Sequence, residues 1–533
     1  MTTPDPERPR RVLVVGGGGR EHAIALALSA SPRIGRLWVA PGNAGTDEWN
    51  VELDVADHSA VTGFCVGQGV DLVVVGPEAP LVAGLVDDLT AAGVPAFGPS
   101  AHAAQLEGSK AHTRAMAERW GIPSPRSATF DDAAAAEAYV RSRGHGVVVK
   151  ADGLAAGKGV LVPDTVEQAV DAVRSLMGDR SVGEAGATVV IEERLVGPEV
   201  SLIGFCDGTT VVPLPAAQDH KRALEGDRGP NTGGMGAFAP TPTCPPELVD
   251  ELTQVFLQRA VDGMRSEGSL YVGMLYAGLM LTDDGPKLLE YNCRFGDPEA
   301  QVLLPLLDTP LLDVVEACVQ GRLGSCDVRL RPGAAATVVM ASGGYPGAYE
   351  TGHRVSGLER AASFATVVHA GTAVDDGAVV TSGGRVLAVT GVGDDLGAAL
   401  DAAYAGVAEL RFCGARFRSD IGSKARGAAG STSPTDAYAA AGVDIAAGDE
   451  AVDRIAARVA ATHDHRVLRG IGAFGGAISL SGLAELGEPV LVASTDGVGT
   501  KTLLAAQHDR WIETAGGHGV EEGERPGALD EDV

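Results

Sequence analysis

The first hundred residues alternate short apolar runs with helical stretches, and this pattern constrains the fold more than any other feature. Apolar runs cover residues 11–15, 37–40 and 71–75, and helical stretches cover 21–30 and 81–92. Strands that are apolar throughout are buried on both faces, and strands separated by helices pair in parallel. Glycine or proline follows each run, at the sheet edge where α/β proteins bind ligands. The pattern predicts a parallel α/β domain with a ligand site at that edge.

The charge of the chain excludes several classes of partner. Its 533 residues carry 42 Lys and Arg against 70 Asp and Glu, a formal net charge of −28. Such a chain repels phosphate backbones and anionic lipid, so we expect no nucleic-acid partner and no membrane partner. The first residues lack the apolar core of a signal peptide, and the uncharged apolar stretches are too short or too broken to span a bilayer. Any phosphate site must therefore be built locally, from backbone N–H groups and a few lysines or arginines.

The cysteines indicate a reducing compartment. Seven are scattered along the chain without a CxxC pair or a metal-binding spacing. An odd, scattered set is typical of reduced thiols, which predicts a cytoplasmic protein.

The rest of the chain divides by composition. Residues 101–325 hold strands of antiparallel style, and residues 326–424 mix strands with a helix near 396–410. A small, polar stretch at 427–434 has the composition of a linker. The acidic, Gly-rich residues 513–533 lack large apolar side chains, which predicts disorder.

Glycines 16–19 follow the first strand, but they do not form a dinucleotide fingerprint. The G-x-G-x-x-G spacing fails because Glu21 and His22 stand where the last glycine is required. The glycines can still let a phosphate approach the start of a helix, and a tight turn without a ligand is the alternative.

A second glycine loop lies at 155–159, with Lys150 on the strand before it. It is not a Walker A loop, because no Ser or Thr follows Lys158 and no helix follows the loop. A hairpin of this kind can fold over a triphosphate, while a solvent-exposed turn is the structural alternative.

A strand-like segment ends in Glu290, Asn292 and Arg294, which period two places on one face. Carboxylate and amide oxygens suit Mg²⁺, and arginine suits an anion. A surface strand with a Glu–Arg pair is the alternative, although two further carboxylates at 295–299 favour a site. The loops at 218–222 and 229–236 are charged and then glycine-rich, as in segments that move or wrap a ligand.

Taken together, these strings resemble glycinamide ribonucleotide synthetase, an ATP-grasp family of de novo purine synthesis. The matching strings run in family order over residues 11–424, at 18–22, 40–45, 75–81, 105–110, 150–159, 218–222, 229–237 and 290–299.

The resemblance implies that ATP lies between two antiparallel sheets, with Mg²⁺ or Mn²⁺ bound to Glu290 and Asn292. The residues that it implies for ATP are Lys110, Lys150, Gly157, Lys158, Gly159, Glu192, Glu193, Leu195 and Glu199. Of these, Glu192 to Leu195 would form the hinge at the adenine, and Glu199 would meet the ribose.

The implied reaction phosphorylates the glycine carboxylate with ATP, and the amine of 5-phosphoribosylamine then attacks the acyl phosphate. The implied catalytic residues are Lys150, Asp219, Lys221 and Arg294. The implied substrate residues are Gly18, Gly19, Asn43, Gly45, Glu78, Asp219 and Arg294, of which Asp219 and Arg294 would grip glycine. Partners would be small molecules only, and the ligase portion would be a monomer.

A second resemblance follows the linker. Residues 438–448, 470–476 and 494–501 are similar to the start of aminoimidazole ribonucleotide synthetase, a phosphoribosylformylglycinamidine cyclo-ligase, and imply that Asp496 and Lys501 belong to its ATP and metal site. The similarity stops near Gln507, so we expect a truncated fragment without cyclo-ligase activity. A working bifunctional enzyme, a non-catalytic interaction module and a segment without a role are the alternatives.

The resulting fold prediction is a multidomain α/β and α+β protein. It comprises a Rossmann-like parallel sheet of the pre-ATP-grasp type, an ATP-grasp domain, a small mixed C-terminal domain and a partial α/β fragment. The expected boundaries are 1–108, 109–325, 326–425, a linker at 426–435, the fragment at 436–510 and the tail at 511–533.

Overall fold

The computed structural model describes residues 8–144, 146–155 and 159–428, and three short strands at 467–469, 476–479 and 490–493. The chain divides into two units, Met1–Ser431 and Thr432–Val533, which are treated separately. Of the predicted site, Gly157, Lys158, Asp496 and Lys501 lie outside the described residues, as do most of the predicted linker and fragment and all of the tail.

The N-terminal segment forms the predicted parallel sheet, with strand order β2-β1-β3-β4. Its predicted single helix at 81–92 is two helices, because Gly84 adopts a left-handed conformation with φ of +94° between them. The elements are β1 (Arg10–Gly16), α1 (Gly19–Ser29), β2 (Ile34–Pro41), α2 (His58–Gln68), β3 (Leu72–Val75), α3 (Glu78–Ala83), α4 (Leu85–Ala91) and β4 (Ala96–Phe97).

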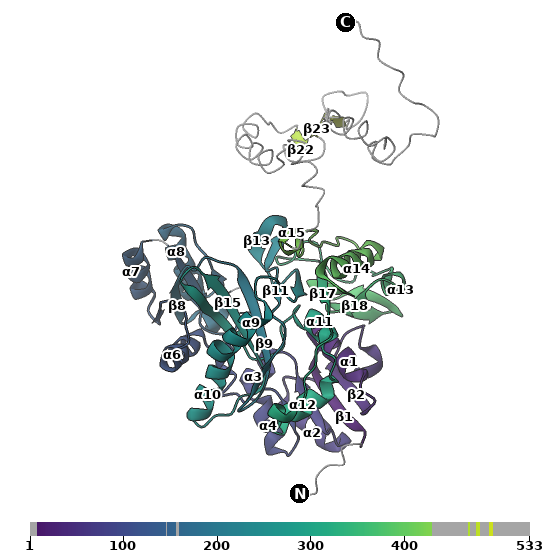
Figure 1. Ribbon diagram of the computed structural model, residues 1–533. Helices are drawn as coiled ribbons and strands as arrows, with labels where there is room; N and C mark the ends of the chain where they lie inside the picture. Colours follow the sequence, from purple (N-terminus) through teal and green to yellow (C-terminus); the bar gives the residue numbers. More distant parts are fainter. Residues whose placement is uncertain are drawn as a thin grey trace, which may run out of the picture. The chain divides into compact units, whose positions relative to one another are not determined.

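The central segment contains two four-stranded sheets, and their observed strand pairs are all antiparallel. The first has the order β5-β8-β6-β7 and carries two helices. Its elements are β5 (Ser127–Phe130), α7 (Ala133–Arg143), β6 (Val147–Ala151), β7 (Val160–Leu161), α8 (Val166–Val173) and β8 (Val189–Glu193). In Figure 1 this sheet and its helices stand at the left of the first unit.

The second central sheet has the order β10-β9-β15-β16. The elements of this part are α5 (Gln105–Gly108), α6 (Lys110–Trp120), β9 (Glu199–Asp207), β10 (Val211–Pro213), α9 (Pro246–Leu252), α10 (Arg259–Ser266), β15 (Val272–Thr282), β16 (Gly285–Asn292), α11 (Ala300–Leu303) and α12 (Leu311–Val319). Strands β9 and β15 are buried along most of their length, which is why both read as continuous apolar runs.

The last segment of the first unit builds a five-stranded sheet, β11-β14-β17-β21-β18, which takes two strands from the central segment. The charged and glycine-rich loops at 218–236 are therefore attached to this sheet. Its elements and their neighbours are β11 (Gln218–Asp219), β12 (Arg222–Leu224), β13 (Arg228–Asn231), β14 (Gly236–Ala239), β17 (Ala334–Ala341), α13 (Leu358–Ala361), β18 (Thr366–His369), β19 (Thr372–Asp375), β20 (Ala378–Thr381), β21 (Arg385–Gly393), α14 (Leu396–Glu409) and α15 (Ser423–Ala428).

One hydrophobic cluster joins the three segments. The rings of Phe97, Phe205 and Phe295 pack together with centroid separations of 6.0–6.3 Å, and all three are buried. The same cluster includes apolar residues of α1 and of the last sheet, and Figure 1 shows α1 close to β18. This shared hydrophobic cluster therefore holds the three segments together.

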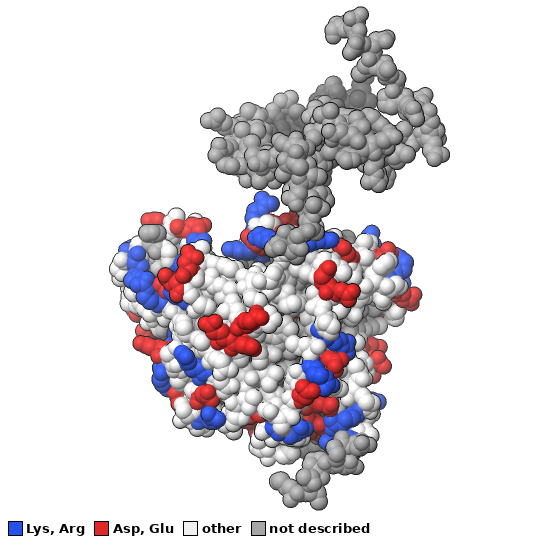
Figure 2. All heavy atoms as spheres, viewed as in Figure 1, with Lys and Arg blue, Asp and Glu red and all other residues white. Residues whose placement is uncertain are grey.

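The surface of the described residues mixes both signs of charge. On the face drawn in Figure 2, acidic and basic side chains are interspersed and neither forms a continuous field. No helix among the described residues combines the length and the apolarity that a membrane crossing needs. All seven cysteines are free thiols.

Candidate active site

A cavity of about 410 Å³ lies where the sheets of the first unit meet. Its walls come from α1, from the start of α6, from β16 and the turn after it, and from the last sheet. The charged side chains in its lining are Arg20, Glu78, Glu107, Lys110, Arg114, Asp219, Lys221, Glu290, Arg294, Asp297, Glu299 and Arg385. Twelve charged groups around one cavity indicate a site for charged, polar ligands.

Strand β16 places Glu290 and Asn292 on the cavity wall, and Arg294 follows directly after its end. The guanidinium of Arg294 donates to the amide oxygen of Asn292 at 3.2 Å. The period-two prediction therefore brings these three side chains to one wall. Among the described residues, the Glu290 carboxylate has no hydrogen-bond or ion-pair partner, so it is available to a cation in the cavity.

Arg294 is held between two carboxylates. Its Nε lies 3.1 Å from Glu78 Oε2, and its second nitrogen lies 2.9 Å from Glu107 Oε1. Burial raises the pKa of Glu107 even against the nearby Arg294, whereas Arg294 outweighs burial at Glu78 and lowers its pKa. The two carboxylates therefore fix the orientation of the Arg294 guanidinium, and Arg294 also lines the cavity.

Lys150 lies beneath this wall and does not line the cavity. Its Nζ lies 2.9 Å from Glu192 Oε2 and donates to the carbonyl of Leu289 at 3.1 Å. Arg114 binds the other oxygen of Glu192 at 2.6 Å. Burial lowers the pKa of Lys150 despite Glu192, while Lys150 and Arg114 together outweigh burial and lower the pKa of Glu192.

Lys221 pairs with two carboxylates at the base of the 218–236 loops. Its Nζ lies 2.8 Å from Asp219 Oδ1 and 3.0 Å from Glu199 Oε2. Although burial opposes it, these two carboxylates raise the pKa of Lys221 well above its usual value. Lys221 is therefore a fixed positive charge on the cavity wall.

Glu299 is a nearly fully buried carboxyl group beside this pair. The hydroxyl of Tyr276 donates to its Oε1 at 2.8 Å, and the hydroxyl of Ser201 does so at 3.3 Å. Burial raises the pKa of Glu299, and the neighbouring Asp219 raises it further. The Glu299 carboxyl group therefore holds a proton more readily than an exposed one does.

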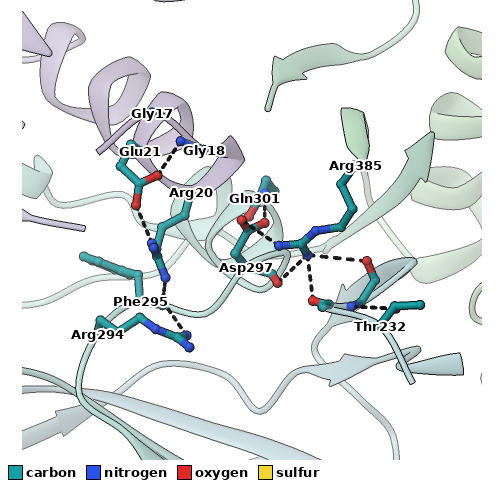
Figure 3. A network of polar contacts seen from close by, with 12 residues as sticks. Gly17, Gly18, Arg20, Glu21, Thr232, Arg294, Phe295, Asp297, Gln301 and Arg385 are labelled. Carbon is teal, nitrogen blue, oxygen red and sulfur yellow. Dashed lines mark hydrogen bonds and ion pairs between the residues drawn. The ribbon is translucent and has the colours of Figure 1, made fainter. Parts of the chain in front are cut away.

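The turn between β16 and α11 presents Asp297 to the cavity, as Figure 3 shows. Its Oδ2 lies 3.0 Å from the guanidinium of Arg385, and its Oδ1 accepts from the Gln301 amide at 2.8 Å. Burial alone would raise the pKa of Asp297, but Arg385 and then Arg20 outweigh it and lower the pKa.

The amino end of α1 faces the same turn. A β-carbon placed on Gly18 or Gly19 would lie 3.6 Å from a carboxylate oxygen of Asp297. Glu21 accepts from the Gly18 N–H at 2.6 Å and pairs with Arg20, whose guanidinium reaches the Phe295 carbonyl at 3.2 Å. Glu21 thus caps the helix and aims Arg20 into the cavity.

The second glycine turn contacts the last sheet. Asn43 donates to the carbonyls of Gly17 and His369, both at 3.0 Å. A β-carbon on Gly45 would collide with the rings of His22 and His369, so only glycine fits there. This turn joins two segments of the first unit and does not line the cavity.

The predicted residues thus fall into two groups. Those that line the cavity are Glu78, Lys110, Gly159, Asp219, Lys221, Glu290, Asn292 and Arg294. Those described that do not line it are Gly18, Gly19, Asn43, Gly45, Lys150, Glu192, Glu193, Leu195 and Glu199. Several of the second group contact the first, as Glu199 contacts Lys221.

Six charged residues of the wall were not predicted as site residues. Four of them lie inside strings that the sequence singled out, so their motifs were the available signal: Arg20, Glu107, Asp297 and Glu299. Arg114 lies on a helix, and Arg385 begins a strand, 88 residues from its partner Asp297. Neither arginine has a local sequence signal.

The donor set on β16 fits a divalent cation that is shared with a substrate. Glu290 and Asn292 supply two hard oxygen ligands, as Mg²⁺ prefers. Among the described residues, no group of three or more His, Cys, Asp and Glu side chains is placed to hold a metal ion. The remaining ligands would therefore come from phosphate oxygens and water.

The three-sheet arrangement around this cavity defines the ATP-grasp class of enzymes. The biotin carboxylase domain of the Hydrogenobacter thermophilus 2-oxoglutarate carboxylase, solved with magnesium ADP, superposes with a TM-score of 0.59 at 14% identity. The match covers 76% of this chain and 91% of that one. At this identity the likeness shows the fold alone.

Sequence similarity shows the family. Models of phosphoribosylglycinamide synthetase match with their N domain at residues 10–107, their ATP-grasp domain at 108–300 and their C domain at 335–424. The chain belongs to the phosphoribosylglycinamide synthetase family, which confirms the predicted resemblance and fold class.

Two relatives named as ligases match most of the first unit, Met1–Ser431, which is therefore called the ligase unit. The phosphoribosylamine–glycine ligase of Nostoc sp. is 51% identical over 420 residues, which are 77% of this chain and 99% of the relative. The crystal structure of the Thermotoga maritima ligase of the same name superposes with a TM-score of 0.68 at 33% identity. It covers 77% of this chain and all of that one.

A longer relative covers more of the chain. The trifunctional purine biosynthetic protein adenosine-3 of Gallus gallus is 51% identical over 502 residues, which are 93% of this chain and 50% of the relative. The chain thus spans about half the length of the trifunctional relatives that it matches.

Proposed function

We propose that the ligase unit joins 5-phospho-D-ribosylamine and glycine with ATP, giving the ribosylglycinamide, ADP and phosphate in purine biosynthesis. One observation carries this proposal. Relatives named phosphoribosylamine–glycine ligase match over nearly their whole length at about 50% identity, across all the segments that line the cavity.

In the first step, a carboxylate oxygen of glycine attacks the γ-phosphorus of ATP, and the bond to the β–γ bridging oxygen breaks. ADP leaves and glycyl phosphate forms. Lys110 and the backbone at Gly159 line the cavity where the phosphates would lie, and Lys221 and Arg294 offer fixed positive charges to a carboxylate. Positioning and charge neutralisation supply most of the catalysis in such phosphoryl transfers.

In the second step, the amine attacks the acyl carbon, the carbon–oxygen bond to phosphate breaks, and the nitrogen loses a proton. The glycine turn at the amino end of α1, with Gly18 and Gly19, would hold the ribosylamine, and Arg20, which lines the cavity at this end, would offer its positive charge to the ribose phosphate. Glu299, which lines the cavity beside Asp219 and Lys221, is a candidate group to accept that proton.

ATP is the nucleotide substrate, and a divalent cation would bind at Glu290 and Asn292. When bound, the cation would neutralise phosphate charge. Mg²⁺ and Mn²⁺ both accept this oxygen donor set, and activity with each cation alone would separate them.

An assay of ADP release by the purified full chain tests the ligase function. We expect ADP release that requires both glycine and 5-phosphoribosylamine, with equal formation of the ribosylglycinamide. ADP release that ignores both substrates would overturn the proposal.

Cyclo-ligase activity in residues 436–510 is the second candidate function. The alignment with the trifunctional relative extends over 93% of the chain, against 77% for the single-function ligase, which supports a separate origin for this segment. Formation of aminoimidazole ribonucleotide by the full chain would establish the activity, and its absence at high enzyme concentration would exclude it.

A further inference from the structure

Arg385 occupies an unusual place in the cavity wall. It begins β21, in the five-stranded sheet of the last segment, yet its guanidinium reaches two other parts of the wall. One nitrogen donates to the Gly233 carbonyl at 2.6 Å and to the Asp297 carbonyl at 2.7 Å, and the other lies 3.0 Å from Asp297 Oδ2. Figure 3 shows the side chain pointing between these two turns.

The Asp297 side of this bridge faces the proposed ribosylamine site. Its carboxylate stands against Gly18 and Gly19 at the amino end of α1, and Gln301 holds its second oxygen. The orientation of Asp297 is therefore set by Arg385 on one side and by Gln301 on the other.

The Gly233 side faces the proposed glycine site. The 229–236 loop returns to β14 beside Asp219 and Lys221, and two side chains from the last segment hold it at Gly233. Arg385, at the start of β21, binds the Gly233 carbonyl, and the hydroxyl of Tyr345, in the turn after β17, accepts from the Gly233 N–H at 3.2 Å. Both backbone polar groups of Gly233 are thus fixed from the same segment.

We infer that Arg385 is a positioning residue that sets the acceptor amine against the acyl phosphate, by fixing Asp297 and the Gly233 turn relative to each other. The inference rests on the proposed ligase function. It gives the last sheet a specific role in the second step. The first step, which depends on lysines and metal ligands, does not require that role.

This placement predicts that the loss of Arg385 uncouples ATP consumption from product formation. In the proposed reaction, phosphorylation of glycine depends on Lys110, Lys221 and the β16 wall. Among the described residues, the hydrogen bonds and the ion pair of the Arg385 side chain go to Gly233, Gly234 and Asp297 instead. Capture of the acyl phosphate depends on the position of the amine, and a displacement of about 1 Å can slow such a step by about a hundredfold. Without the bridge, glycyl phosphate would still form, but water would hydrolyse a larger share of it.

The test compares ADP release with ribosylglycinamide formation in Arg385→Lys, using ATP, Mg²⁺, glycine and 5-phosphoribosylamine. Lysine keeps the charge but cannot bind three acceptors in the planar fork of arginine. We expect a ratio of ADP to product raised at least about tenfold over the wild-type ratio, and a raised KM for the ribosylamine, as the lost alignment predicts. ADP release at saturating glycine should stay within about threefold of the wild type.

Tyr345→Phe provides a second variant that keeps the shape of the wall. It removes only the hydroxyl from the Gly233 N–H, so we expect a smaller rise in the same ratio. Arg360→Lys is the matched control, because Arg360 lies in the same segment but pairs with Glu409 at the exposed surface. Its ratio should equal that of the wild type.

A purely structural role gives a different result. ADP and product would then fall together, with the ratio unchanged and a lowered thermal midpoint, and this outcome would overturn the inference. An unchanged ratio in a fully active Arg385→Lys enzyme would do the same. If the wild-type chain makes no ribosylglycinamide, the proposed function itself fails, and the inference falls with it.

Discussion

The Nζ of Lys150 and the Oε2 of Glu192 lie 2.9 Å apart, on neighbouring antiparallel strands, and both side chains are buried. Lys150, which was predicted to contact the ATP phosphates, therefore has a fixed protein partner in Glu192, which was predicted to belong to the adenine hinge. Arg114 holds the other oxygen of Glu192, so the three groups form one buried network beneath the β16 wall.

We predict that Lys150→Met weakens ATP binding at least about tenfold, the loss of one charged contact, and weakens glycine binding much less. Burial lowers the pKa of Lys150 and makes its charge costly, so a nearby triphosphate would stabilise the ammonium form. Calorimetric titration with ATP and with glycine measures both affinities. Lys424→Met, at an exposed lysine, is the control, and equal ATP affinity in Lys150→Met and wild type would contradict the assignment.

We predict that Glu290→Gln loses most of the turnover while the fold survives. The Glu290 carboxylate lines the cavity without a described protein partner, so its removal disturbs no ion pair, but a neutral amide binds Mg²⁺ more weakly. When turnover is measured across Mg²⁺ concentrations, Glu290→Gln should require a higher Mg²⁺ concentration for half-maximal turnover than the wild type.

The control for that prediction is Asp283→Asn, in the turn that joins β15 to β16. It removes a carboxylate from the same hairpin away from the cavity and should leave turnover unchanged. Unchanged turnover of Glu290→Gln at limiting Mg²⁺ would remove Glu290 from the metal site.

The sequence could predict this part of the site because its geometry is local. Period two on one strand places Glu290 and Asn292 on a common face, whatever the strand packs against. The parallel sheet was equally accessible, since a strand buried on both faces must be apolar at every position.

The rest depends on pairing between distant segments. Lys150 pairs in register with Val190, which brings Glu192 diagonally beside it, and no local pattern encodes that register. Arg385 and Asp297 meet only because β21 and the turn before α11 pack around the same core. The break at Gly84 was missed because both halves of the helix carry the same apolar pattern.

We predict an acid-sensitive junction at His22 and His369. Burial and the neighbouring His369 lower the pKa of His22 to about 3, and burial lowers that of His369 to about 4. Since both folded-state pKa values lie below the usual 6.5, the unfolded chain binds more protons below pH 6.5. Stability is therefore full above pH 6.5 and falls as the pH drops toward 4, by about 2 kcal/mol per histidine at pH 5.

The variant His22→Asn tests this junction. Its amide oxygen can accept the hydrogen bond that the His369 N–H donates to Nδ1 at 2.8 Å, but it cannot titrate. Chemical denaturation measures the unfolding free energy at pH 7.5 and at pH 5.0. We expect the fall between these two pH values to be about 2 kcal/mol smaller in His22→Asn than in the wild type. His102→Asn, at an exposed histidine, should behave as the wild type, and an equal loss in His22→Asn would contradict the prediction.

We predict, last, that the ligase unit tolerates removal of everything after Lys424. Beyond that point the described residues of the first unit add the buried side chain of Ala425 to a hydrophobic cluster, and one exposed ion pair between Arg426 and Asp401. Together these contribute about 2 kcal/mol at most, which corresponds to a fall of no more than about 8 °C in the thermal midpoint. Activity should be unchanged, because the composition of 427–434 predicts few contacts across it.

A shorter chain that ends at Phe417 is the matched control, because it removes Arg418. That guanidinium is almost fully buried, pairs with Asp227 at 2.9 Å and donates to the Arg222 carbonyl at 3.0 Å, so it fastens the β12–β13 hairpin beside the cavity. Its loss should cost about 3–5 kcal/mol, because Asp227 and the hairpin carbonyl lose their partner. Ligase activity should then collapse in the shorter chain alone. Collapse in the chain that ends at Lys424 would instead mean that the second unit supports the ligase.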